Sequence, residues 1–134
     1  MNLYQLAGGS VALRRMTETF LAKAQADPLL SEMFGGKDDH AEHIAGYFIM
    51  NFGGPDDYLR ERGDLRFLLR RHVGLHITEG QRARWLELMT ESARETGMPE
   101  AFIAVFVQYL QGTSHTTVQV SNLSPDQART MLGA

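Results

Sequence analysis

The stretch LLRRHVGLHI at residues 68–77 organises the chain, because it seats one histidine, His72, among large apolar residues. An imidazole in apolar surroundings needs a hydrogen-bond partner or a bound ligand, since its polar nitrogens are otherwise costly to bury. Neutral imidazole is also the commonest metal ligand in proteins. His72 is therefore either an ordinary, partly buried histidine with a backbone partner or the ligand of a metal.

The size and charge of the chain narrow the class of protein. Its 134 residues suit one domain with a single core. Hydrophobic residues make up 43% and charged residues 22%, which indicates a folded protein rather than a disordered one. The formal net charge of -3 is too small to attract nucleic acid or an anionic membrane, and no basic run carries interleaved aromatics. We expect neither nucleic acid nor membrane as a partner.

The sequence contains no cysteine, which excludes disulfides, thiolate metal sites, iron–sulfur clusters and a cysteine nucleophile. No apolar run approaches the roughly 20 residues that span a bilayer. The first residues lack a basic segment followed by an apolar core, so the sequence predicts no signal peptide and a cytoplasmic location.

Apolar residues recur at three- and four-residue spacing along most of the chain, and no stretch shows the alternation of a hairpin. The pattern predicts an all-α fold of short helices joined by glycine-rich corners. Ser10 is expected to cap the second helix, and the stretch at 78–81 resembles a capping box. Residues 1–120 are expected to form the domain, and 121–134 a loosely attached tail. The helices are expected at about residues 2–7, 11–25, 29–34, 40–52, 64–72, 81–96 and 99–118.

Two arrangements of the histidines could bind a metal. In the first, His40 and His43 on one helix join His72 and carboxylates in a closed site for zinc or a di-metal centre, as in a metal-dependent helical enzyme. Neither His40–His43 nor the pair of His72 and His76 shows the Glu-x-x-His spacing that such sites often carry. The metal-enzyme hypothesis therefore has weak support.

In the second arrangement His72 ligates a haem iron from one side, and the helix carrying His40 and Ile44 faces it from the other. A haem also needs an apolar slot and cationic groups for its propionates, which Arg70 and Arg71 could supply. The same aromatics could instead only fill an α-helical core, as in a haem-free sensor or interaction domain. The apolar residues that could wall the slot are Phe20, Leu21, Phe34, Phe48, Trp85, Met89 and Phe106.

Several features occur in a fixed order over roughly residues 3–118. Gly8-Gly9 follows the short first helix, and Phe34 ends the short third one. The corner Phe52-Gly53-Gly54-Pro55 and Tyr58 come next, followed by Arg71-His72 and then Arg84-Trp85-Leu86 with Met89. In this order the chain resembles the truncated haemoglobins, most closely their group II branch.

The resemblance implies a globin-like, two-over-two helical sandwich around one haem b, with His72 as the iron ligand. It implies that Trp85 donates a hydrogen bond to the bound gas, which suits a side chain whose one polar group is an N–H donor. It matches His40 to the distal gate, although His43 could take that place. The residues expected at the cofactor are His72, Trp85, Phe34, His40, Ile44, Phe48, Tyr58, Leu69, Arg71, Ile77 and Met89.

The chain departs from the family pattern on its second helix. Many members carry a tyrosine there that bonds bound oxygen, whereas this chain has Phe20-Leu21. The resemblance implies binding of oxygen, carbon monoxide and nitric oxide, with nitric oxide oxidation or peroxidase-like chemistry as further uses. A reductase would be an additional partner, and the chain is expected to be a monomer or homodimer.

Overall fold

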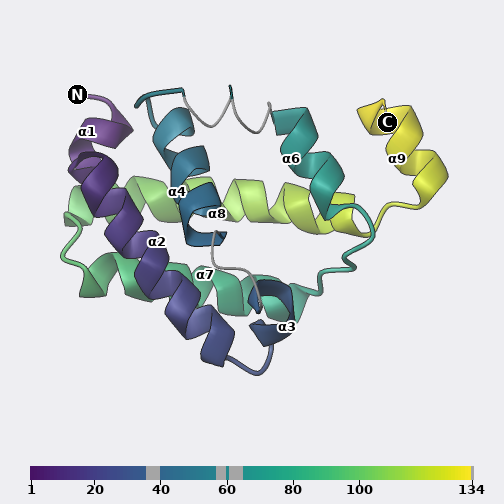
Figure 1. Ribbon diagram of the computed structural model, residues 1–134, viewed down its shortest axis with the longest axis horizontal. Coiled ribbons are helices and arrows are strands. Elements are labelled where there is room, and N and C mark those ends of the chain that lie inside the picture. Colours follow the sequence, from purple (N-terminus) through teal and green to yellow (C-terminus); the bar gives the residue numbers. More distant parts are fainter. Residues whose placement is uncertain (36–39, 57–59, 61–64, 134) are drawn as a thin grey trace.

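The computed structural model describes residues 1–35, 40–56, 60 and 65–133, with residues 65–67 as backbone alone. Every regular element in these ranges is a helix, which confirms the all-α prediction (Figure 1). None of the described helices is long and apolar enough to cross a membrane. In chain order they are α1 (Leu3–Ala7), α2 (Gly9–Ala26), α3 (Ser31–Phe34), α4 (His40–Asn51), α6 (Leu65–His72), α7 (Glu79–Glu95), α8 (Glu100–Ser121) and α9 (Pro125–Leu132).

Two helix pairs form the body of the molecule. Helix α2 packs against both α4 and α7, and α7 packs against α8. Phe48 of α4 meets Phe106 of α8 edge-on at 5.3 Å between ring centroids, so α4 also lies across α8. The α2–α4 pair crosses the α7–α8 pair (Figure 1), which confirms the two-over-two arrangement.

One apolar stripe from each long helix builds the core between these pairs. The three- and four-residue spacing on α2 places Leu13, Met16 and Phe20 on a single face, where each is fully buried. Helix α8 contributes Phe102 and Phe106 in the same way. Fully buried aromatic side chains each remove a large apolar area from water, so this stripe pairing is the main source of stability.

The first corner differs from the prediction at its cap. Gly8, with φ of +100°, ends α1 and also precedes α2, which begins at Gly9. Ser10 is therefore not the N-cap of α2, and the prediction was wrong. Its hydroxyl instead bonds the Tyr4 hydroxyl at 2.7 Å. The left-handed backbone at Gly8 turns the chain so sharply that α2 starts before Ser10 can cap it.

Helix α1 docks onto the corner that ends α4. The Tyr4 amide donates to the Phe52 carbonyl at 2.9 Å, and Asn2 donates to the Gly53 carbonyl at 3.2 Å. A methyl group on Gly54 would lie 2.6 Å from the Tyr4 ring and 2.8 Å from Ile49. Glycine is required at this position because the two helix ends approach more closely than a side chain permits.

The C-terminal residues also differ from the prediction. Helix α8 continues to Ser121, and residues 125–132 form α9 with a capping box at Ser124. Helix α9 packs against α6 and buries Ala128. The short α9 was predicted to be a loose tail because it has few apolar residues, but its own cap and its contact with α6 order it. The domain boundary near residue 120 stays a prediction.

We expect Gly54→Ala to lower the free energy of unfolding by about 1–3 kcal/mol, because the new methyl group overlaps the Tyr4 ring. Urea denaturation followed by circular dichroism would measure the change. Gly112→Ala in α8 is the matched control, since a methyl group there meets no atom within 4 Å. It should raise the free energy of unfolding by about 0.5–1 kcal/mol. Equal effects of the two substitutions would contradict the close approach of α1 to this corner.

Candidate functional site

His72 is the last residue of α6, and its ring is held by the backbone of its own helix. Its Nδ1 lies 2.8 Å from the carbonyl oxygen of Leu68, one turn earlier. A carbonyl oxygen can only accept, so Nδ1 carries the proton and donates. The lone pair is then on Nε2, which has no hydrogen bond to any described residue. This tautomer leaves Nε2 ready to bind a metal.

The protonation state of His72 suits the same role. Burial lowers the pKa of the imidazole below its ordinary value of 6.5, and the charge of Arg71 lowers it further, against the opposing effect of the Leu68 carbonyl. A lowered pKa means that the folded protein disfavours the protonated ring. His72 is therefore neutral at pH 7, and protonation competes with metal binding only in more acidic solution.

Aromatic side chains from four other helices, α2, α3, α4 and α7, lie together. The Phe20 ring meets Phe34 edge-on at 5.4 Å and Trp85 edge-on at 6.0 Å between ring centroids. Phe34 in turn meets the His40 ring edge-on at 5.9 Å. The structure therefore brings together Trp85, Phe34 and His40, with Phe20 as their link. The family resemblance implied Trp85 and His40 for the distal side and Phe34 for a place at the cofactor.

Two polar groups in this chain of rings have no hydrogen-bond partner among the described residues. The Nδ1 atom of His40 is buried and has no hydrogen-bond partner within the described part of the chain. The indole N–H of Trp85 likewise bonds none of the described residues, and the Trp85 side chain is only half-buried. Buried or half-buried polar groups without partners are costly unless a ligand or water completes them. His43 lies one turn along α4 and is also half-buried.

Other residues predicted to line the haem slot pack in or against the hydrophobic core. Phe48 is nearly buried and stacks on Phe52 at 5.5 Å. Met89 of α7 is fully buried in the same core. Ile44 of α4 is half-buried and packs against this core. Sequence spacing places these residues on an inner face, but it cannot separate a slot wall from the core behind it.

The remaining predicted residues lie near His72 or outside the described ranges. Leu69 is half-buried on α6, and Ile77 is 8% exposed just beyond it. Arg71 is exposed, as a propionate partner would be, whereas the Arg70 guanidinium reaches the Gly133 carbonyl at 3.4 Å. Tyr58 lies outside the described residues.

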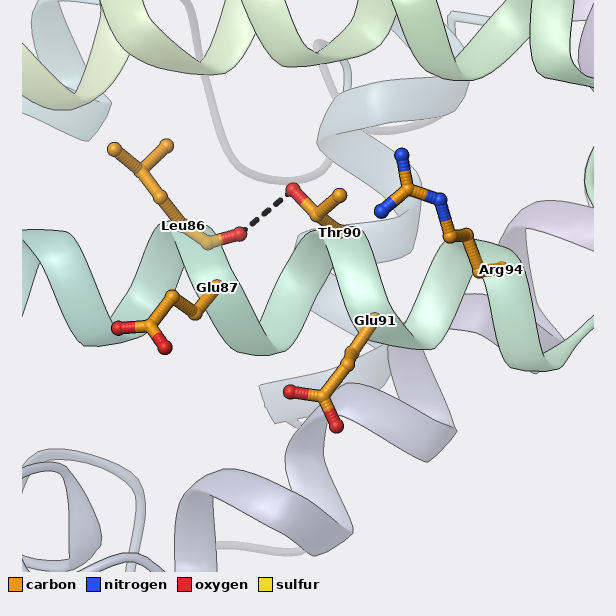
Figure 2. Close-up of a pocket in the computed structure, with 5 residues that line it drawn as sticks. All are labelled: Leu86, Glu87, Thr90, Glu91 and Arg94. Atoms are coloured by element: carbon orange, nitrogen blue, oxygen red, sulfur yellow. Dashed lines mark hydrogen bonds between the residues drawn. The ribbon is translucent and has the colours of Figure 1, made fainter.

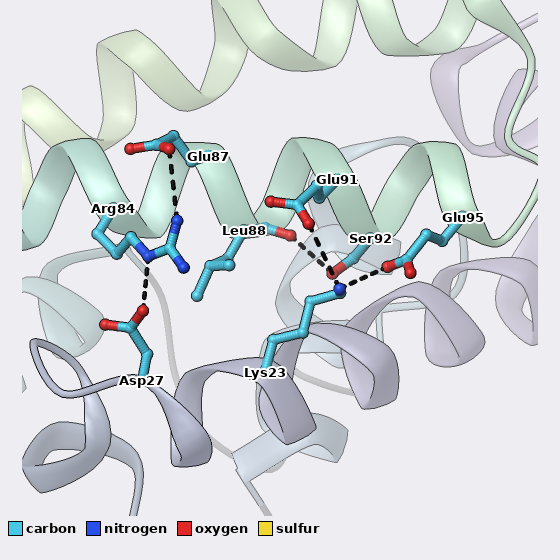
Figure 3. Close-up of polar contacts among 8 residues, drawn as sticks. All are labelled: Lys23, Asp27, Arg84, Glu87, Leu88, Glu91, Ser92 and Glu95. Atoms are coloured by element: carbon cyan, nitrogen blue, oxygen red, sulfur yellow. Dashed lines mark hydrogen bonds and ion pairs between the residues drawn. The ribbon is translucent and has the colours of Figure 1, made fainter.

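An ion pair that the sequence did not reveal holds the residue before Trp85. Arg84 donates through Nε to Asp27 at 2.5 Å (Figure 3). Asp27 also accepts the Leu29 amide at 2.9 Å. The Arg84 guanidinium holds the pKa of the Asp27 carboxyl below its usual value of 3.8. The sequence did not predict this ion pair, because no local pattern reveals a partner 57 residues away.

A second set of ion pairs links α2 to α7. Lys23 lies 2.7 Å from Glu95 and 3.5 Å from Glu91 (Figure 3). These groups are more exposed than Asp27, so solvent weakens their attraction. The Asp27–Arg84 pair is thus the better-shielded link between the α2–α3 corner and the turn of α7 that carries Trp85.

A shallow surface depression of about 380 Å³ lies on α7 itself. Figure 2 shows its lining along one side of the helix, and the residues are Leu86, Glu87, Thr90, Glu91 and Arg94. It contains none of the residues predicted for the cofactor, and three of its five side chains are charged. This depression is not the haem site.

The described histidines and carboxylates do not support the metal-enzyme hypothesis. Within the described ranges no three histidine, aspartate or glutamate side chains gather closely enough to hold a metal ion. His40, His43 and His72 therefore do not form a closed zinc or di-metal site there. A single neutral imidazole fits a haem iron better than it fits a closed site of several ligands.

The sequence profile of the bacterial-like globins matches residues 2–119. The chain belongs to the bacterial-like globin family. No curated protein matches it by sequence. The family confirms the predicted resemblance to truncated haemoglobins and implies a haem cofactor, haem b, with binding of gases at its iron.

Solved structures of other haemoglobins share the fold. The haemoglobin of Chloroflexus aurantiacus is 31% identical with a TM-score of 0.81, over 87% of this chain and 97% of the other. The haemoglobin of Thermobifida fusca is 28% identical with a TM-score of 0.79, over 88% and 97%. The group II truncated haemoglobin of Bacillus anthracis is 24% identical with a TM-score of 0.83, over 94% and 97%, and shows the fold alone. Membership of group II stays a prediction.

We expect Asp27→Asn to destabilise this globin at neutral pH and to matter less in acid. Because the pKa of Asp27 is lowered on folding, its ion pair contributes stability above the ordinary value of 3.8, and this contribution is lost as the pH falls through the lowered pKa. Urea denaturation at pH 7 and at about pH 3 would show the difference from the unsubstituted protein shrink.

Glu87→Gln is the control for this measurement, because Glu87 meets the same Arg84 at 3.4 Å but is 63% exposed. It should change stability little at either pH. A destabilisation by Asp27→Asn that is equal at both pH values would show that the charge of Asp27 contributes nothing.

Proposed function

We propose that this protein binds oxygen, carbon monoxide and nitric oxide at a haem b iron held by His72. The observation that carries the proposal is the hydrogen bond from Nδ1 of His72 to the Leu68 carbonyl. Because Nδ1 carries the proton, Nε2 of the neutral ring keeps a lone pair that can bind iron. The iron supplies an open coordination position for a diatomic gas. The haem would contact Leu69, Ile77, Ile44, Phe48 and Met89, with Arg71 and Tyr58 near its propionates.

We assign the distal side to Trp85, Phe34 and His40. The indole N–H of Trp85 donates to none of the described residues, so it is available to a bound gas. Leu21 stands where many relatives have a tyrosine and offers no donor. A hydrogen bond to a partly charged ligand contributes about 1.5–3 kcal/mol, so losing one donor speeds release about tenfold or more. We propose reversible binding rather than very slow oxygen release.

We assign the distal gate to His40 rather than His43. The His40 ring packs against Phe34, and its buried Nδ1 has no hydrogen-bond partner among the described residues. An unpartnered nitrogen beside the distal aromatics can turn toward a ligand without first breaking a bond to protein. We expect His40 to act as a gate and not to bind the iron at rest.

Redox uses of the same site require a second protein. Nitric oxide oxidation by oxygen and peroxide reduction both need electrons, which a reductase must deliver. No residue contact favours either reaction over reversible binding, so we propose gas binding, with oxygen transport among its uses, as the activity. A cytoplasmic location and a monomeric or homodimeric state stay predictions.

The purified protein supplied with haem should give a Soret band that shifts when carbon monoxide is added to the ferrous form. His72→Ala should remove or strongly alter this spectrum, because no other described imidazole occupies the end of α6. The ferric spectrum should lack the bands of bis-histidine coordination.

His115→Ala is the control for this experiment, since it removes an exposed histidine on α8. It should leave every spectrum unchanged. A protein that folds fully without haem and takes up none would instead support the haem-free sensor or interaction domain.

Trp85→Phe should speed oxygen dissociation about tenfold, because it removes the indole N–H and keeps most of the ring contact with Phe20. Stopped-flow mixing with a ligand scavenger would measure the rate. Tyr4→Phe removes a hydroxyl bonded to Ser10, on helix α1, and should leave the rate unchanged. An unchanged oxygen dissociation rate in Trp85→Phe would contradict the assignment of the indole as a hydrogen-bond donor to the bound gas.

A further inference from the structure

The backbone that follows His72 is bound to a single residue at the end of α8. The amides of Gly74 and His76 both donate to the Ser121 carbonyl, at 3.2 Å and 3.1 Å. The next amide, that of Ile77, donates to the Ser121 hydroxyl at 3.0 Å. Three of the four amides of residues 74–77 therefore donate hydrogen bonds to Ser121.

The neighbouring Asn122 completes the attachment. Its side-chain amide donates to the Ile77 carbonyl at 3.1 Å and to the Val118 carbonyl at 2.8 Å. Ser121 itself is fully buried, and its hydroxyl donates to Val118 at 2.8 Å. We call Ser121 and Asn122 the α8 clamp.

The clamped segment, residues 74–77, contains two residues with left-handed backbone conformations. Gly74 has φ of +86°, and His76 has φ of +51°, the one positive φ among the described non-glycine residues. A left-handed backbone is unfavourable for a side chain such as that of histidine. The bonds of His76 and Ile77 to Ser121 offset this cost and hold the segment in place.

The clamped segment leads directly to the iron ligand. The Leu75 amide donates to the His72 carbonyl at 3.2 Å, and the His72 ring is bonded to Leu68 within the same helix end. A displacement of residues 74–77 therefore moves the backbone of His72 and with it the ring. These bonds attach the segment that follows α6 to the C-terminal end of α8.

We propose that Ser121 is a positioning residue for the proximal histidine, so that the α8 clamp sets the orientation of the His72 ring toward the haem. The proposal rests on the proposed function. The profile of the bacterial-like globins ends at residue 119, two positions before Ser121, so the family match does not include the clamp.

The test is Ser121→Ala in the haem-loaded protein. This substitution removes the acceptor of the Ile77 amide and keeps the carbonyl that accepts from Gly74 and His76. Resonance Raman spectra of the ferrous, ligand-free form report the iron–histidine stretch directly. We expect this band to shift and broaden, and the Ile77 amide to exchange its hydrogen about tenfold faster.

Ser92→Ala is the matched control, because Ser92 is also fully buried but its hydroxyl bonds only the Leu88 carbonyl of its own helix. It should leave the iron–histidine band in place. An unchanged band in Ser121→Ala, or an equal shift in both variants, would overturn the proposal. A wild-type protein that takes up no haem would instead overturn the proposed function and this proposal with it.

Asn122→Ala provides a second variant in case Ser121→Ala does not fold. Asn122 is exposed, so its loss leaves no buried cavity. It frees the Ile77 and Val118 carbonyls and removes a donor that lies 3.3 Å from the Ser121 hydroxyl. The iron–histidine band should shift in the same direction and by less. A folded Asn122→Ala protein with the wild-type band, together with an unfolded Ser121→Ala protein, would assign the clamp to stability alone.

Discussion

The hydrogen bond from His72 to the Leu68 carbonyl is the constraint on which the rest of the site depends. It fixes which ring nitrogen carries the proton, and it holds the ring against rotation at the end of its helix. The bond exists only while α6 stays helical through its last turn. Helix α8 packs against α6 from one side and α9 from another, so the surrounding helices preserve this one bond.

The two sides of the proposed haem differ in chemistry. The proximal side depends mainly on hydrogen bonds of the backbone around His72, to which Ser121 and Asn122 each add one side-chain partner. The distal side depends on side chains: one indole donor, one imidazole and two phenylalanine rings, with Leu21 adding no donor. Ligand affinity is therefore expected to vary with distal residues, while the retention of iron varies with the position of α6.

The periodic apolar pattern was sufficient to predict the helices, because most of their stability comes from one buried stripe each. The capping box at Thr78 was predicted correctly for the same local reason. The cap at Ser10 was wrong because the conformation of Gly8 decides where α2 begins. The order of α9 was missed because its stability comes from contact with α6, which no short stretch of sequence encodes.

The sequence could nominate candidate site residues where a residue's chemistry is rare, but not where the contact depends on distant partners. His72 stood out as a histidine among apolar residues, whereas Trp85 was indicated by the resemblance to the truncated haemoglobins. The Asp27–Arg84 pair and the bonds of Ser121 join residues 57 and 44 positions apart, so only the folded chain reveals them.

Phe20 touches both Phe34 and Trp85 edge-on and is itself fully buried. A change in the position of one distal ring is therefore expected to shift the others through Phe20. Substitutions at Trp85 and Phe34 are thus energetically coupled: the free-energy change of the double variant will not equal the sum of the single ones.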